Sequence, residues 1–133
     1  MLEHIDIRTA RRNELTDITA RVKDTVAKSG VKNGIVIVYC EHTTAGITIN
    51  ERADPAVKTD ILAHLSKLVP ENGAFLHAEG NSDSHIKSLI VGVSKTLIIE
   101  NGIPILGQWQ AVFFCEFDGP RTRKVHIKVI GDE

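Results

Sequence analysis

The sequence predicts one α+β domain over residues 1–133, with mainly antiparallel sheet flanked by two to three helices. Strand-like segments follow one another directly in the second half of the chain, and the helical segments stand apart from them, as in α+β proteins. Turn sequences at 101–102 and 118–120 join neighbouring strands. The hydrophobic content of 42% and charged content of 25% are ordinary for a globular protein.

The first thirty residues predict a strand and then a helix. Residues 3–9 alternate between apolar and polar side chains, as in a half-buried strand whose polar face carries His4. Asn13 can cap a helix that ends at Ser29 and Gly30. The apolar positions that indicate this helix recur every three or four residues: Leu15, Ile18, Val22 and Val26.

Two strands separated by a polar turn come next. Residues 35–40 form a continuous apolar run, which indicates a central strand covered on both faces. Residues 47–50 alternate again and predict a second strand. The segment 42–46 between them therefore forms a turn.

The middle of the chain predicts two helices joined by a long loop. Asp54 followed by Pro55 is a strong helix start, and Pro70 ends that helix. Its expected buried stripe is Val57, Ile61, Leu65 and Leu68. Residues 70–82 form a connection rich in Gly and Asn, and long loops in compact domains are often functional. The next helix begins at Ser82, and its expected core face is Ile86, Leu89, Ile90 and Val93.

Three strands complete the prediction, at 96–100, 108–117 and 124–130. Alternation in the last strand places its apolar residues on one face and leaves His126 exposed on the other. The basic side chains near this hairpin are expected to form a solvated face: Arg121, Arg123, Lys124 and Lys128.

Charge and hydropathy exclude several classes of partner. A net charge of -1 gives no electrostatic basis for binding nucleic acid. No apolar run approaches membrane-spanning length, and no leader-like segment precedes the first strand. We therefore expect a cytoplasmic protein with neither a nucleic-acid nor a membrane partner. Cys40 and Cys115 lie within apolar runs, which favours buried free thiols, with one disulfide as the alternative.

Three of the six histidines lie where functional side chains usually lie. His42 follows a buried strand, His77 lies in the long loop, and His85 lies in the first turn of the third predicted helix. If they converge, three imidazoles leave an open fourth position, as a catalytic zinc site requires. We therefore expect a divalent metal ion, with zinc favoured over magnesium, although this spacing is no standard zinc signature.

The start of the third predicted helix can also bind an anion. Gly80 lets the backbone approach a ligand, and the first N–H groups of a helix lack partners within it. They can receive a phosphate whose charge Lys87 or Arg121 neutralises. The other possibility is that a side chain within 81–83 only caps the helix.

Four motifs follow one another along the chain: His42-Thr43-Thr44-Ala45, the block from Gly80-Asn81 to His85-Ile86-Lys87-Ser88, Leu106-Gly107-Gln108-Trp109-Gln110 and Asp118-Gly119-Pro120-Arg121. In order and at suitable spacing, they resemble the signatures of the YjbQ family, also called the secondary thiamine-phosphate synthase family. The resemblance implies a β-sandwich flanked by helices, assembled as a homotrimer with pockets near subunit boundaries. It also implies a metal site at His42, His77 and His85. Family members commonly have threonine in place of Gln108 and often alanine within 82–84, where Asp83 adds a charge.

Three functional hypotheses from different classes follow. The first is a small-molecule enzyme, metal-assisted, acting on a phosphorylated or heteroaromatic metabolite, with thiamine-phosphate synthase as a secondary activity. Its candidate catalytic residues are His42, Glu79, Asp83, His85 and Glu116. Its candidate substrate-binding residues are Thr43, Thr44, Asn81, Lys87, Ser88, Trp109 and Arg121. The second is a non-catalytic trimeric module that binds a metal, an anion or a metabolite, and a structural subunit with a vestigial site is a third possibility.

Overall fold

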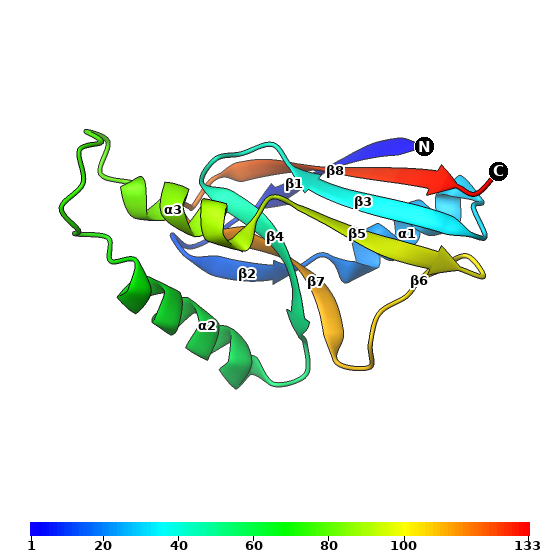
Figure 1. The fold of residues 1–133 in the computed structure, drawn as a ribbon, viewed down its shortest axis with the longest axis horizontal. Helices are drawn as coiled ribbons and strands as arrows, with labels where there is room; N and C mark the ends of the chain where they lie inside the picture. Colours follow the sequence, from blue (N-terminus) through cyan, green and yellow to red (C-terminus); the bar gives the residue numbers. More distant parts are fainter.

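A computed structural model describes residues 1–133 as eight strands and three helices (Figure 1). In chain order the elements are β1 (Leu2–Arg8), β2 (Glu14–Asp17), α1 (Thr19–Ser29), β3 (Gly34–Cys40), β4 (Ala45–Glu51), α2 (Pro55–Leu68), α3 (Ser82–Val91), β5 (Ser94–Glu100), β6 (Ile103–Pro104), β7 (Gln110–Glu116) and β8 (Thr122–Gly131). None of the three helices is both long and apolar enough to cross a bilayer.

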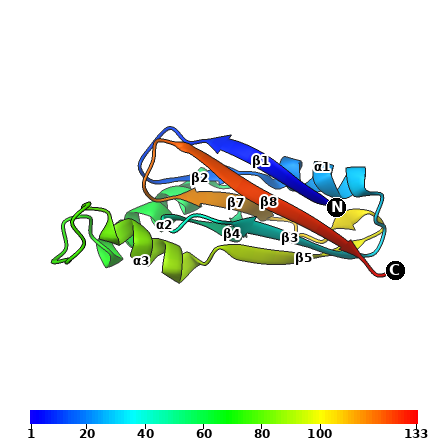
Figure 2. The same cartoon turned by 90° about the horizontal axis from the view of Figure 1, so that it is seen from above.

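The strands form two antiparallel sheets, so the α+β prediction is confirmed. A five-stranded sheet has the order β1-β8-β3-β5-β6, and a three-stranded sheet has the order β2-β7-β4. Figure 2 shows the two sheets as layers, with β8 running beside β1 above β7 and β2. One buried cluster joins them, with Val36 and Ile127 from the larger sheet packed with Ile47 and Phe114 from the smaller one. The facing sides of the two sheets and the apolar face of α1 therefore share the main core, and the other side of β7 contributes to a second, smaller cluster.

The first helix begins later than predicted. Asn13 caps nothing there, because α1 starts at Thr19 with Ile18 as its N-cap residue. Leu15 belongs instead to the short strand β2, which pairs with β7 at the edge of the smaller sheet. The three-residue spacing of Leu15 and Ile18 suits a helix, but strand pairing gives the backbone groups of this segment partners in the sheet.

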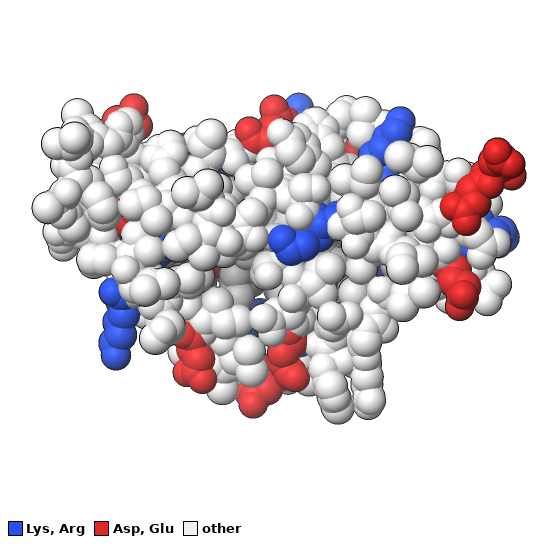
Figure 3. Space-filling model, in the orientation of Figure 1, with Lys and Arg blue, Asp and Glu red and all other residues white.

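The predicted start of α2 is confirmed, whereas its predicted buried stripe is confirmed only in part, because Ile61 and Leu65 are half-buried against the domain and Leu68 is exposed. The Asp54 side chain accepts a hydrogen bond from the Ala56 N–H at 2.9 Å, and Pro55 occupies the first helical position. No residue of α2 is buried, and Leu68 is 62% exposed. Between α2 and the smaller sheet lies an apolar pocket of about 550 Å³, visible as a hollow in Figure 3. The helix therefore covers a second, smaller buried cluster only in part: Ile61, Leu62 and Leu65 are half-buried and pack against Leu15, Ala111, Phe113, Cys115 and Phe117.

The third helix faces the domain with its polar side, opposite to the prediction. Its buried residues are Asp83, Ser84, Lys87 and Ser88. Leu89 and Ile90, predicted as core, are 82% and 53% exposed. Figure 3 accordingly shows few charged side chains on the face of the molecule that carries α3 and β5.

Side-chain hydroxyls explain this orientation of α3. Ser84 donates a hydrogen bond to the carbonyl of Phe117, just beyond β7, and Ser88 donates to the carbonyl of Ala45 at 2.6 Å. These bonds hold the helix against the ends of β7 and β4, whose carbonyls need partners in the interior. A Cβ at Gly46 would lie only 2.6 Å from the Gly92 carbonyl oxygen, so the approach also depends on glycine.

The two cysteines are buried free thiols, as predicted. Burial raises the pKa of Cys115 to about 12 and raises that of Cys40 as well. Both side chains therefore stay protonated and act as small apolar groups in the sheets.

Candidate functional site

A polar pocket of about 480 Å³ lies at one end of the molecule, beside the start of α3. Three segments that are distant in sequence build it: 41–44 after β3, 77–85 from the long loop into α3, and 118–123 from the turn into β8. None of its lining residues is apolar. They are Glu41, His42, Thr43, Thr44, His77, Glu79, Asn81, His85, Asp118, Arg121 and Arg123.

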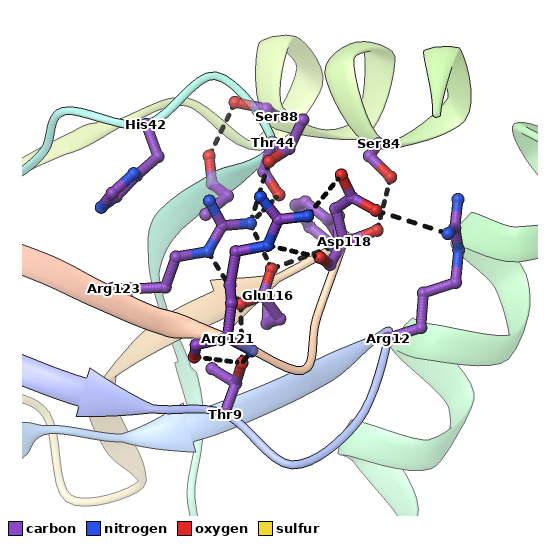
Figure 4. Close-up of polar contacts among 12 residues, drawn as sticks. Thr9, Arg12, His42, Thr44, Ser84, Ser88, Glu116, Asp118, Arg121 and Arg123 are labelled. Atoms are coloured by element: carbon purple, nitrogen blue, oxygen red, sulfur yellow. Dashed lines mark hydrogen bonds and ion pairs between the residues drawn. The ribbon is translucent and has the colours of Figure 1, made fainter. Parts of the chain in front are cut away.

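A buried ion pair forms the floor of the polar pocket (Figure 4). Glu116 is 0% exposed and Arg123 3%, and two guanidinium nitrogens of Arg123 contact the two carboxylate oxygens of Glu116. Thr9 donates its hydroxyl to Glu116 at 2.8 Å, and Arg123 donates to the Thr44 hydroxyl at 2.9 Å. Burying two charges costs free energy that only such close pairing offsets.

This floor corrects two predictions. Arg123 does not belong to a solvated face, because its side chain is buried and paired. Glu116 was predicted to act as an acid or base, but it lies beneath the lining residues with both oxygens bonded. Its position suits it to holding Arg123 in place, because both of its oxygens already accept hydrogen bonds from within the protein.

The predicted turn at 118–120 positions side chains at the rim of the polar pocket, above the buried ion pair. Asp118 accepts hydrogen bonds from the Asn81 amide at 2.9 Å and from Arg121 Nη2 at 3.1 Å. Arg121 also donates its Nε–H to the Asp118 carbonyl at 2.8 Å. Asp118 therefore fixes one amide and one guanidinium at the rim of the polar pocket, where Arg121 remains half exposed.

Asp83 and Lys87 lie under α3 and not in the polar pocket, contrary to their predicted roles. Arg12 Nη2 contacts Asp83 Oδ1 at 3.0 Å, and Lys87 Nζ lies 3.7 Å from Asp83 Oδ2. Lys87 also donates to Asn13 at 3.2 Å. Burial lowers the pKa of Lys87, and the charge of Asp83 opposes that shift. These contacts hold α3 against the loop between β1 and β2, which carries Arg12 and Asn13.

Of the three histidines in the polar pocket, His77 and His85 contact each other, and His42 stands apart from them. His77 and His85 are in edge-to-face contact, with ring centroids 5.4 Å apart, and Glu79 Oε2 lies 3.8 Å from His77 Nε2. His42 is held by β8, because its Nε2 accepts the backbone N–H of Lys124 at 3.0 Å.

As these side chains stand, the predicted three-histidine set does not fit a metal ion. No group of three or more His, Cys, Asp or Glu side chains is placed to share one. The Nε2 lone pair of His42 is already occupied by a backbone N–H. We therefore assign no chemical step to a metal in this pocket.

Comparison with known proteins identifies the family. The family model described as "UPF0047 protein YjbQ-like" matches residues 3–132. The chain belongs to the YjbQ family. It is 56% identical over 133 residues to the UPF0047 protein MJ1081 of Methanocaldococcus jannaschii, covering 100% of this chain and 96% of the relative. It is 49% identical to YugU of Bacillus subtilis, covering 98% of this chain and all of that one.

Solved structures of YjbQ relatives share this fold. An uncharacterized conserved YjbQ/UPF0047 protein from Clostridium acetobutylicum has a TM-score of 0.95 at 51% identity, covering 96% of this chain and 99% of that one. A YbjQ-like protein of unknown function from Sulfolobus solfataricus has a TM-score of 0.96 at 32% identity, covering 99% and 97%. The antiparallel α+β architecture is thus the family's own.

The polar pocket of this YjbQ-family chain contains only part of the predicted site. Predicted residues that line it are His42, Thr43, Thr44, His77, Glu79, Asn81, His85 and Arg121. Trp109 is 55% exposed in the turn before β7, and the Ser88 hydroxyl is bonded to Ala45, so neither lines it. Lining residues absent from the predicted site are Glu41, Asp118 and Arg123. The alternation of β8 offered a signal for Arg123, which falls on the core-facing side with Val125.

His42 is expected to titrate below the ordinary range of histidine. Burial, and secondly the positive charge of Arg123, lowers its pKa. Between the folded value and an unfolded value of about 6.5, the unfolded chain binds more protons, so stability falls as pH decreases through this window. Proton NMR of the ring measures the midpoint in native protein and in urea. A native midpoint equal to or above the urea value would contradict this assignment.

Proposed function

We propose that this chain is an enzyme that acts on a small phosphorylated or otherwise anionic metabolite in the polar pocket. One observation carries the proposal: three imidazoles, two guanidiniums and three carboxylates line one pocket that has no apolar wall. A structural pocket needs few such groups, whereas proton transfer to a bound anion uses most of them.

The proposed roles follow from how each side chain is held. Arg121 is fixed by Asp118 and half exposed, so it can present N–H donors to an anionic oxygen. His85 projects from α3, which hydroxyl bonds anchor to the sheets, and its ring is in contact with that of His77. We assign general acid–base work to His85 because a positioned imidazole is the side chain that most often transfers protons in enzymes.

Thiamine-phosphate synthesis is one reaction of this kind to assay. In it, a thiazole phosphate nitrogen displaces pyrophosphate from a pyrimidine. Arg121 would bind an anionic group of a substrate, but Trp109 is too remote to provide the aromatic wall. We therefore place this reaction within a wider panel of phosphorylated metabolites.

The test is turnover of that panel followed by phosphorus NMR, with and without added divalent ions. His85→Ala should lower the rate by about 10²- to 10⁴-fold, the usual effect of removing a general acid or base. Arg121→Met should chiefly raise KM, because it removes an anion contact that is present before reaction. His64→Ala is the matched control, since His64 lies exposed on α2 outside the polar pocket. Saturable binding without turnover in the wild type would instead favour a non-catalytic binding module.

Metal content tests the divalent-ion hypothesis separately. Wild-type protein purified without an affinity tag is compared with His77→Ala and His85→Ala. Near-stoichiometric zinc that both substitutions abolish would mean that these side chains rearrange around an ion. Retention of the same metal in both variants would place that ion elsewhere in the molecule.

The homotrimer belongs to the same proposal. Its support is a pair of exposed apolar side chains that lie beside polar-pocket histidines and in a monomer would face water: Leu76 and Leu89. Light scattering on purified protein measures the mass directly. A mass of one chain across the concentration range would contradict the trimer.

A further inference from the structure

A second group of titratable side chains lies on the outer face of the larger sheet. His4 of β1 stands directly opposite His126 of β8, and their Nδ1 atoms are 2.6 Å apart. On the other side of the ring, His126 Nε2 lies 2.7 Å from Glu41 Oε1. The three side chains thus form a continuous row, although Glu41 and His126 are 85 positions apart.

We propose that His4 and His126 form a chelating site for a divalent transition-metal ion, with Glu41 orienting the His126 ring. This site is distinct from the histidines of the polar pocket and does not depend on the proposed enzymatic function. Two imidazoles supply the protein ligands, and water completes the coordination of the ion.

Strand pairing preorganises the two ligands. Residues directly opposite in an antiparallel pair have Cβ atoms about 4.5–5.5 Å apart and project to the same face. The two rings are perpendicular, at 87°, and their Nδ1 atoms face each other. A tetrahedral ion with Zn–N bonds of about 2.0–2.1 Å needs its nitrogens only about 3.3 Å apart. Small ring rotations achieve that separation without moving the backbone.

Glu41 is the carboxylate partner that a metal-binding histidine usually has on its second ring nitrogen. Such histidines usually donate their second ring N–H to a carboxylate, which fixes the tautomer and makes the ligand more basic. With a proton on Nε2 shared with Glu41, the Nδ1 lone pair of His126 is directed toward His4. The same hydrogen bond is the main reason that the pKa of Glu41 is lowered, so its carboxylate stays charged.

The surroundings select the kind of ion. Lys124 and Lys128 share the outer face of β8 with His126, and only Asp6 on the facing strand and Glu41 offset them. A site with so little negative charge has no basis for holding Ca²⁺ or Mg²⁺, which need several oxygen ligands. Imidazole instead favours Zn²⁺, Cu²⁺ and Ni²⁺, and affinity normally peaks at Cu²⁺.

The test titrates metal-free protein with Cu²⁺ and, separately, with Zn²⁺ by calorimetry. Wild-type protein should bind one ion at this site. Glu41→Gln should weaken binding by about 10- to 100-fold, the effect of losing an outer-shell partner. His4→Ala and His126→Ala should each weaken it by more than that. His64→Ala is the control for a lone exposed histidine and should leave binding unchanged. Equal affinity in His4→Ala and wild type would overturn the proposal.

Paramagnetic broadening locates the ion in the unmodified protein, so it does not depend on whether a variant folds. Cu²⁺ at this site should broaden the amide resonances of β1 and β8 around positions 4 and 126 first. Broadening confined to 77–85 would assign the ion to the polar pocket and overturn the proposal. His85→Ala provides the matching check, because it removes a polar-pocket imidazole and should leave broadening at β1 and β8 intact.

Discussion

Replacing Glu116 with glutamine is expected to destabilise the fold by about 3 to 5 kcal/mol, because it leaves the Arg123 charge buried without its counter-ion. Both side chains are essentially inaccessible to water, at 0% and 3% exposure. Thr9 and Thr44 cannot compensate, since a hydroxyl offers a dipole in place of a charge. Urea denaturation at a fixed protein concentration measures the free energy of unfolding.

A double variant separates pairing from burial. Arg123→Met alone should cost a similar amount, because it leaves the Glu116 carboxylate unpaired. Combining Glu116→Met with Arg123→Met should recover part of the loss, since two apolar side chains of similar volume carry no desolvation penalty. A loss below about 1 kcal/mol for Glu116→Gln would mean that the pair contributes no more than an exposed ion pair.

Substituting alanine for Gly119 is expected to cost about 3 kcal/mol, at the upper end of the range for overpacking. A Cβ there would lie 2.2 Å from the Arg11 carbonyl oxygen and 2.8 Å from the Thr9 hydroxyl. The carbonyl belongs to the backbone and cannot rotate away, so the turn itself must shift. Because Asp118 and Arg121 flank this glycine, the shift should also reduce anion binding in the polar pocket.

Gly107→Ala is the matched control for this substitution. Its new Cβ would lie 3.3 Å from the Gln110 side chain, which is exposed and can move. Surface changes of this kind usually stay within about 0.5 kcal/mol. Thermal or urea unfolding of both variants gives the comparison, and equal destabilisation of the two would show that the turn tolerates a side chain at 119.

Strand periodicity predicted much of this fold because β1, β5 and β8 of the larger sheet each bury one consistent face. Ile5 and Ile7 in β1, and Val125 and Ile127 in β8, alternate with exposed residues as expected. The predicted turn at 101–102 is also confirmed, and both of its residues have positive φ. Periodicity failed for α3, because an amphipathic pattern does not say which side faces the domain. There, hydroxyl bonds to two carbonyls decided the orientation.

The separate segments of the candidate site could be predicted from the sequence, but their convergence into one pocket could not. Polar turns at 42–46 and 118–120 were identified, as was the loop leading into α3, since each carries side chains that a core excludes. Their convergence depends on strand order, which no local pattern contains. Asp83 and Lys87 illustrate the limit: the sequence predicts both as site residues, yet Asp83 forms ion pairs with Lys87 and with Arg12 beneath the helix.

The position of β8 in the larger sheet has a consequence for how the molecule is made. Among the described strands it leaves the ribosome last, yet it lies between β1 and β3 and supplies Arg123 to the floor of the pocket. Until it inserts, β1 has no partner in its sheet and Glu116 has no counter-ion. The pairings of β8 with β1 span most of the chain, and such distant contacts slow folding. The polar pocket therefore cannot be complete before β8 pairs with β1 and β3, because Arg123 comes from that strand.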